Sequence, residues 1–475
     1  AIDSPSEDAA AAEDGTVRSH HFAGGDTARP SGQGNEEHLR IVQEQLRRAV
    51  EIDIVSALSS NGERTLPADG APIRAGDGIT LDVVIRNESA GHRFPGGVRD
   101  TQDTWIELRV VGANGATIAE AGTQRERGDD PTAFVLRTLV LDEHGQPELE
   151  HLVHRFRAVA YDHSVPVRGA RVVRYSFDVP ERLPSRVLPL RVEARLRHRR
   201  HSRAFQAFVC EANRTPRGRA FARASRQRGH APIDPCRAQP ITDLATSVVW
   251  LGGERPGEGG AERPTWRRLF DYSLGLLGDV QDHLDYARPS IARGLEAAGD
   301  QDVRRRAMFM ALRARLEAKQ GRLAEALDWA RRAEELVGEH PAIWRIRGRA
   351  YAQVWQWESA STALERVTQL APGDTAGWRD LAQARGSAGH DREALSAAQA
   401  GLALLPRDES LLRSQALALE HLGSPSAGAA QESWLNFRQP DDHAALRIRC
   451  GQDVPGCERE RQPVPVYRMR QPASR

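Results

Sequence analysis

Residues 341–374 read PAIWRIRGRAYAQVWQWESASTALERVTQLAPGD, and residues 375–408, TAGWRDLAQARGSAGHDREALSAAQAGLALLPRD, follow the same plan. Three kinds of residue recur here at a spacing of 34 positions: a tryptophan (Trp344, Trp378), an alanine (Ala326, Ala360, Ala394) and a proline (Pro372, Pro406, Pro440). Because these positions are independent of one another, their common spacing indicates an internal repeat, which decides the fold of the C-terminal half.

Each repeat has the composition of two packed helices. The proline ends the second helix because it cannot continue the hydrogen-bond ladder. The small residues let the two helices approach closely, and the aromatic residues fill the space between neighbouring pairs. A period of 34 with this pattern is the signature of the tetratricopeptide repeat. We therefore predict an α-helical tetratricopeptide array over residues 264–448, with a degenerate last repeat at 409–442.

An array of this kind binds peptides or other domains on its concave surface and has no chemistry of its own. We expect it to bind a protein partner or further copies of the chain. The candidate partner-binding residues are Trp344, Tyr351, Trp378 and Arg385. The sequence has no phosphate-binding loop and no nucleophile elbow, so we expect no enzymatic activity.

Composition limits the remaining possibilities. The chain has 475 residues and a formal net charge of +1, which suits two or three domains and argues against a polyanionic partner. It has no apolar run long enough to span a membrane. Its four cysteines form two local pairs, Cys210 with Cys236 and Cys450 with Cys457. Two disulfides in an oxidising compartment would explain this spacing, and four free buried thiols are the alternative.

The first 200 residues consist of two segments with different sequence patterns. Residues 1–34 are an acidic, alanine-rich leader that we expect to be extended, and it contains the motif Ser19-His20-His21-Phe22. Residues 35–200 are predicted to be one helix, from Glu36 to Ala49, followed by an immunoglobulin-like antiparallel β-sandwich. The predicted strands are 50–58, 79–87, 105–111, 117–121, 134–141, 152–161, 171–179 and 188–196.

The connection from Asn87 to Asp100 is longer than a plain hairpin needs, and it is rich in glycine. It either packs on a neighbouring element or presents His92, Arg93 and Arg99 to a ligand. Its sequence Ala90-Gly91-His92-x-Phe94-Pro95-x-Gly97, followed by Trp105, resembles the loop of the β-sandwich domain in multihaem c-type cytochromes of the cytochrome c-554 type. In that family the sandwich follows a haem domain and precedes tetratricopeptide repeats.

The resemblance implies that His20 or His21 is a distal axial ligand of a haem c, with His92 a weaker candidate. Arg93 and Arg99 would contact haem propionates. The chain contains no CxxCH motif, so the haem would be attached to upstream sequence or to a haem-bearing partner chain.

Two other patterns suggest different functions. A zinc hydrolase could use three histidines as metal ligands, and the candidates are His151, His154 and His163. However, His151 and His154 are three positions apart, and on a strand such positions face opposite sides of the sheet. Residues 191–230 contain twelve arginines and two glutamates. This positive charge could bind nucleic acid, haem propionates or an acidic neighbouring protein, or it could belong to a solvated surface. We expect no nucleic-acid partner, because the cysteines indicate an oxidising compartment.

The remaining segments are predicted to be connections. Residues 201–263 are an arginine-rich linker with short helices, one of them at Ile241 to Leu251, and residues 449–475 are an extended tail. The function predicted is that of an accessory, C-terminal part of a periplasmic or extracellular multihaem cytochrome assembly. The alternative is a haem-free secreted adaptor that binds a protein through its repeats.

Overall fold

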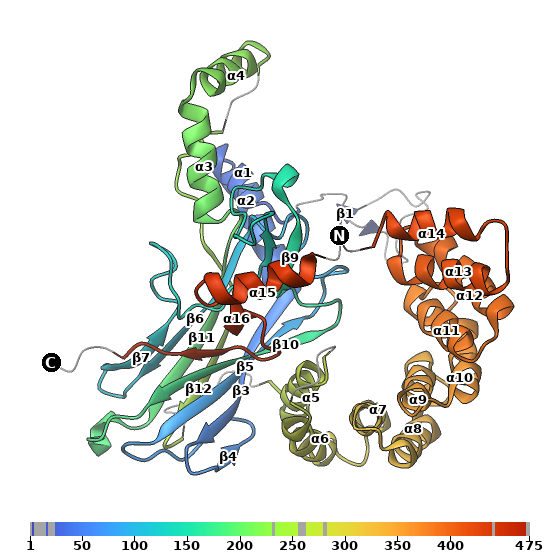
Figure 1. Ribbon diagram of the computed structural model, residues 1–475. Helices are drawn as coiled ribbons and strands as arrows, with labels where there is room; N and C mark the ends of the chain where they lie inside the picture. The colour runs from blue at the N-terminus through green and yellow to red at the C-terminus, as the bar shows by residue number, and fades with distance from the viewer. Residues whose placement is uncertain are drawn as a thin grey trace.

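The computed structural model describes residues 24–229, 233–254, 263–278, 283–438 and 442–471, together with the backbone of residues 2–3 and 16–17. The molecule has a β-rich N-terminal part and a curved C-terminal array of helices (Figure 1). Two short strands, β1 (Ile2–Asp3) and β2 (Thr16–Val17), pair near the N-terminus. His20 and His21 lie outside the described residues, and so does Pro440.

Two helices precede the sheets, α1 (Ala28–Gly32) and α2 (Glu36–Ala49). The prediction for α2 is confirmed. The Asn35 side chain caps it by accepting a hydrogen bond from the backbone nitrogen of His38 at 2.9 Å. Val42 and Leu46 are buried on one face of α2, where they join the core of the sheets.

Two sheets share one hydrophobic core. The first has the order β13-β10-β5-β3-β4 and the second the order β12-β11-β6-β7. Neighbouring strands are antiparallel, except that β13 runs parallel to β10. Side chains from both sheets, among them Leu81 and Leu108, are fully buried in the common core. The immunoglobulin-like type of this layered part stays a prediction.

The strands of the first sheet are β3 (Val50–Ser59), β4 (Arg64–Thr65), β5 (Gly78–Asn87), β10 (Ala170–Asp178) and β13 (Val466–Arg468). Those of the second are β6 (Asp103–Val111), β7 (Thr117–Ala121), β11 (Leu190–Arg199) and β12 (Thr242–Leu251). A separate pair consists of β8 (Thr138–Leu141) and β9 (Ala158–Asp162). Short 3₁₀ turns occur at Val153–Arg155 and Ser185–Val187.

The structure corrects three sequence predictions in this part. The strand predicted at 134–141 begins only at Thr138. The segment from Ile241 to Leu251, predicted to be a helix, is strand β12, because it pairs with β11 along its whole length and buries Leu244, Val249 and Leu251. The strand predicted at 152–161 begins only at Ala158. The chain before it turns, since His151 has a positive φ of 60° and a 3₁₀ turn follows.

The C-terminal helices pack as consecutive pairs. Gly348 shows why small residues recur, because a Cβ atom there would lie 2.6 Å from Cγ of Leu364 in the next helix. The helices are α5 (Thr265–Leu276), α6 (Leu284–Ala298), α7 (Val303–Lys319), α8 (Leu323–Val337), α9 (Pro341–Gln353), α10 (Trp357–Leu370), α11 (Thr375–Ser387), α12 (Asp391–Leu404), α13 (Glu409–His421) and α14 (Ala427–Leu435). Among the helices that the structure describes, none is both long and apolar enough to cross a bilayer.

One ion pair recurs with the 34-residue period. Asp374 and Asp408 are the N-caps of α11 and α13, and each also pairs with an arginine of the preceding repeat. These pairs are Arg345 with Asp374 and Arg379 with Asp408, the second at 2.7 Å. Each aspartate therefore caps the first helix of one repeat and links it to the first helix of the repeat before.

Helix α5 fixes the beginning of the array on the outer face of the first sheet. Its residues Leu269, Tyr272 and Leu276 share a hydrophobic cluster with Val84 and Val172 of the sheet. Polar contacts surround this cluster, and we call the whole contact the α5 interface. Its ion pairs are Arg268 with Asp53 at 2.9 Å, Arg86 with Asp271 at 3.0 Å and Arg174 with Asp82 at 2.7 Å.

The end of the array also returns to the sheets, which corrects the predicted extended tail at 449–475. Helix α15 (His443–Asp453) packs Leu446 and Cys450 against the β8–β9 pair, and α16 (Cys457–Glu460) follows. Strand β13 then joins the first sheet, and Tyr467 is fully buried in the common core. The array is thus attached to the β-rich part at both ends (Figure 1).

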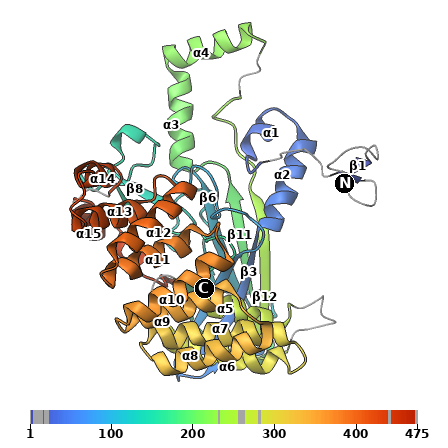
Figure 2. The same cartoon turned by 90° about the vertical axis from the view of Figure 1, so that its right-hand side faces the viewer.

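The predicted cysteine pairs are both bonded, Cys210 with Cys236 and Cys450 with Cys457. The first disulfide lies in a helical projection that leaves the second sheet between β11 and β12. This projection, the α3–α4 arm, consists of α3 (Arg203–Arg214) and α4 (Pro216–Gln227) and extends away from the rest of the molecule (Figure 2).

Candidate functional site

The loop from Asn87 to Asp100 is held by two side-chain amides. Asn87, at the end of β5, is buried and donates from Nδ2 to the carbonyl oxygen of His92 at 2.9 Å. Gln102 donates from Nε2 to the carbonyl oxygens of Gly96 and Val98. Phe94 is 3% exposed, so it anchors the centre of the loop in the core. The loop is therefore a fixed element and not a loose connection.

His92 is exposed on this loop. Its Nδ1 lies 2.9 Å from the carbonyl oxygen of Arg93, which leaves Nε2 as the ring nitrogen available to a ligand. The imidazole covers Gly96, where a Cβ atom would lie 2.3 Å from Cε1 of His92. A side chain at position 96 would displace the ring, so glycine is required for this arrangement.

The two arginines of the loop form hydrogen bonds to other residues of the same chain. Arg93 donates to Oγ of Ser164 at 2.8 Å, and Arg99 donates to Asp162 at 3.1 Å. Burial alone would raise the pKa of Asp162, but hydrogen bonds from Ser164 and the charges of Arg99 and Arg93 lower it. Both guanidinium groups therefore fix the loop against the turn after β9.

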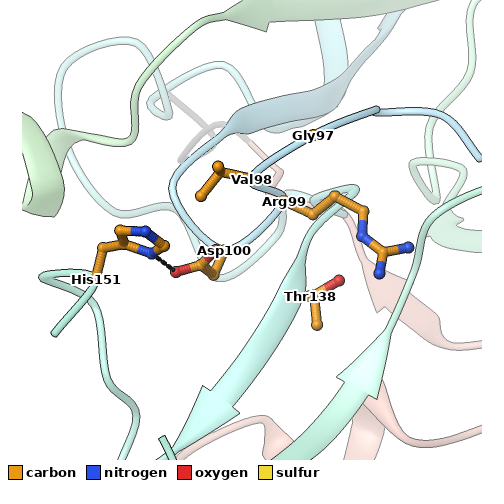
Figure 3. A pocket seen from close by; sticks show the side chains of 6 residues that line it. All are labelled: Gly97, Val98, Arg99, Asp100, Thr138 and His151. Carbon is orange, nitrogen blue, oxygen red and sulfur yellow. Dashed lines mark hydrogen bonds and ion pairs between the residues drawn. The ribbon is translucent and has the colours of Figure 1, made fainter. Parts of the chain in front are cut away.

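A pocket of about 240 Å³ lies beside this loop. Figure 3 shows His151 and Asp100 facing each other at its edge, with Nδ1 of the histidine 2.7 Å from the carboxylate. A carboxylate in this position orients an imidazole and leaves Nε2 free to accept a proton or bind a ligand. The other lining residues are Gly97, Val98, Arg99 and Thr138.

The three histidines considered as a zinc site, His151, His154 and His163, do not meet. His154 is exposed, whereas His163 is buried between Tyr161 and Phe134, with each ring nitrogen within 3.0 Å of a backbone carbonyl oxygen. Burial lowers the pKa of His163 to about 4. Within the described ranges, no three His, Cys, Asp or Glu side chains form a group that could hold a metal ion.

The second candidate site is the inner side of the curved array, formed by α9, α11 and α13 (Figure 1). Equivalent positions of successive repeats line up along these helices at the 34-residue period. We define the inner face by four exposed residues of these helices: Arg349, Gln383 and Leu417, which occupy equivalent positions, and Arg413, one turn before Leu417. Arg349 is 54% exposed although it pairs with Asp380.

No protein-family model matches the chain, and no curated protein is similar to it. Among solved structures, MamA is 16% identical, with a TM-score of 0.30 over 36% of this chain and 98% of its own. YrrB, described as a tetratricopeptide protein with an unusual peptide-binding site, is 18% identical, with a TM-score of 0.30 over 39% of this chain and 91% of its own. At this TM-score the likeness carries no argument.

The assignment stands instead on the paired helices and the 34-residue period. Within the helical array, residues 303–435 form paired helices with the 34-residue period that is typical of tetratricopeptide repeats. Its predicted partner-binding aromatic residues, Trp344, Tyr351 and Trp378, are half-buried against the core of the array. Nε1 of Trp378 donates to the carbonyl oxygen of Pro372 at 2.8 Å, and Arg385 pairs with Glu365 at 3.2 Å. The structure thus places all four predicted partner-binding residues in contacts within the array.

Sequence reasoning missed the most exposed residues of the inner face and the partner of His151. The inner-face residues carry a signal, because Arg349, Gln383 and Leu417 stand 34 positions apart. The pairing of Asp100 with His151 has no such signal in the sequence, since the two residues are 51 positions apart and only the fold brings them together.

Proposed function

We propose that this chain is a scaffold protein without catalytic activity, whose repeat array binds a protein partner along its inner face. The observation that supports this most is the attachment of the array to the β-rich part at both ends, by α5 and by α15 to β13. Such attachment holds the curvature of the array constant. A preformed surface loses less conformational entropy on binding than a flexible one, which favours affinity.

The side chains of the inner face suit a polypeptide ligand. Arginine can pair with carboxylates or donate hydrogen bonds to backbone carbonyl oxygens, and Leu417, which is 38% exposed, offers apolar contact. The two disulfides suit an oxidising compartment, so we propose a periplasmic or extracellular location.

The test begins with crosslinking the full chain to its neighbours in the native source and purifying the protein that is captured. Calorimetry would then compare its binding to the wild type and to the inner-face variant Q383K/R413E/L417D. The matched control is R392E/S396D/Q399K, which changes exposed residues of α12 on the outer side of the array. We expect a loss of about tenfold or more for the inner-face variant alone. Equal affinity for all three proteins would refute the proposal.

The second candidate function is that of an accessory chain in a multihaem cytochrome assembly. It is supported by the likeness of the Gly91 to Gly97 loop to that family and by the exposed Nε2 of His92, a nitrogen that can bind haem iron. An absorption spectrum of the protein isolated with its partners, oxidised and then reduced with dithionite, tests it. A sharp c-type α band that changes in a His92→Ala variant would support this function, and a spectrum without a Soret band would exclude it.

A further inference from the structure

Helix α3, the inner part of the α3–α4 arm, is fixed by side-chain contacts and by a disulfide. Gln206 of α3 donates to the carbonyl oxygens of Pro235 and Arg237, and the disulfide joins Cys210 to Cys236 in the same returning segment. At the base, the ring of Phe205 lies edge-on to His151 at 6.2 Å. Neither helix of the arm has a fully buried residue, and the arm projects away from the rest of the molecule (Figure 2).

The outer part of the arm carries a dense positive charge. From Arg203 to Gly229 the sequence has seven arginines and one acidic residue, Glu211, although the whole chain has a net charge of only +1. The six arginines beyond the disulfide are all exposed: Arg214, Arg217, Arg219, Arg223, Arg226 and Arg228. None of the six forms an ion pair with a carboxylate of the described residues, and Arg219 donates to the backbone carbonyl of Arg214.

Three of these arginines form a stripe. Arg219, Arg223 and Arg226 are spaced i, i+4 and i+7, which places them on one side of α4. Like charges at this spacing destabilise a helix. Arginines near the start of α4 also oppose the positive end of its dipole. The stripe therefore weakens the helix that carries it, and folding gives no reason for its presence.

The composition of α4 distinguishes among anionic partners. A helix that lies on a membrane needs an apolar side with several large residues, whereas α4 has one, Phe221, on the side opposite Arg223. Nucleic acid is disfavoured by the disulfide at the base of the arm, which indicates an oxidising compartment. Guanidinium groups pair with carboxylates in a two-pronged geometry, and carboxylates are the partners of many arginines elsewhere in this molecule, among them Arg174 and Arg268.

We propose that the α3–α4 arm is a docking surface for an acidic polypeptide segment, whose carboxylates pair with Arg219, Arg223 and Arg226. This site is separate from the inner face of the repeat array. It adds a second partner surface, and it can be correct or wrong independently of the function proposed for the array.

The experiment uses the full chain and a fluorescein-labelled helical peptide with glutamates at i, i+4 and i+7, followed by fluorescence anisotropy. We expect binding that weakens with added salt and falls about tenfold or more in R219E/R223E/R226E. The control variant R293E/R304E/R392E reverses three exposed arginines of the array that form no ion pair within the described ranges, and it should bind as the wild type does. Circular dichroism checks that both variants keep their helices.

Three results would overturn the proposal. The first is equal weakening in the control variant, which would mean that total charge and not the arm decides binding. The second is unchanged binding in the arm variant. The third is stronger, stripe-dependent binding to phosphatidylserine vesicles or to a DNA duplex than to the peptide, which would identify a different class of partner.

Discussion

The α5 interface and the α3–α4 arm use arginine in opposite ways. In the α5 interface, Arg268 is 12% exposed and lies between Asp53 and Asp69, and it donates to the carbonyl oxygen of Ile54. On the arm, the arginines are exposed and have no carboxylate partner among the described residues. Arginine therefore joins two parts of this molecule in the α5 interface, whereas on the α3–α4 arm it is available to another molecule.

The difference is energetic as well as geometric. Removing one partner of a buried pair leaves an uncompensated charge out of water, which is strongly destabilising. An exposed guanidinium stays hydrated, so its loss costs the fold almost nothing. Substitutions in the α5 interface should therefore affect stability, and substitutions on the arm should affect binding.

The largest expected effect is that of Asp82→Ala. Asp82 is 2% exposed and accepts hydrogen bonds from both Nε and an Nη of Arg174, at 2.7 and 2.9 Å, and from the hydroxyl of Tyr272 at 2.5 Å. We expect a loss of about 3–5 kcal/mol in the free energy of unfolding, because Arg174 would stay buried without its partner. Urea denaturation measures the loss, and faster amide exchange in α5 locates it.

The control for this prediction is Asp328→Ala. Asp328 pairs with Arg331 on the exposed surface of α8, so the unfolding midpoint should stay at its wild-type value. Similar losses in the two variants would contradict the distinction between buried and exposed pairs.

The second prediction concerns the arm itself. Replacing Cys210 and Cys236 by serine opens a connection of 26 residues, and we expect a loss of about 2–4 kcal/mol in local stability. Amide exchange in α3 and α4 should become faster while that of the sheets stays unchanged. The matched control, C450S/C457S, opens a separation of only 7 residues and should have a smaller effect, confined to α15 and α16. A global loss of stability in the first variant would mean that the arm supports the sheets.

The two regions also differ in how far the sequence predicts them. The repeat array was predictable because each repeat contacts its immediate neighbours, so residues such as Trp344 and Trp378 recur at the same spacing as the helices. The α5 interface could not be predicted, because its ion pairs join residues that are far apart in the sequence, such as Asp53 and Arg268. Strand β13 was missed for the same reason, since it pairs with β10 nearly 300 residues earlier.

The candidate sites follow the same rule. The unusual composition of the loop around His92 and of the arm was visible in the sequence, because each lies within one short segment. The pairing of His151 with Asp100 depends on the fold, since a positive φ at His151 turns the chain where the sequence pattern predicts a strand.

The third prediction uses pH to separate the regions. Burial raises the pKa of Asp271 in the α5 interface to about 6, against the charges of Arg86 and Arg267. The folded protein therefore binds more protons than the unfolded chain between pH 3.8 and about 6. The contribution of Asp271 to stability is complete below this window and is lost as the pH rises through 6. Between pH 5 and pH 7 we expect this carboxyl to change the free energy of unfolding by about 1–2 kcal/mol.

Amide exchange in α5 at pH 5 and at pH 7, corrected for the intrinsic rate, measures this contribution. In Asp271→Asn the difference between the two pH values should shrink, because the amide does not ionise. Peptide binding to the arm should weaken only slightly at pH 5, since arginine keeps its charge and the glutamates of the peptide are still mostly ionised. An Asp271→Asn variant with the full wild-type pH dependence would contradict the assignment to this carboxyl.

The smallest expected effect is also the sharpest test of the comparison. In Arg223→Glu, the repulsion of Arg223 by Arg219 and Arg226 becomes attraction at spacings i+4 and i+3. We expect α4 to gain about 0.5 kcal/mol of local stability, seen as slower amide exchange. The same variant should bind the acidic peptide more weakly, because the centre of the stripe would repel it. A residue that costs its own helix stability and improves binding is typical of a functional surface. If Arg223→Glu instead weakened both the helix and the binding, Arg223 would have a structural role in the arm, and the contrast with the α5 interface would fail.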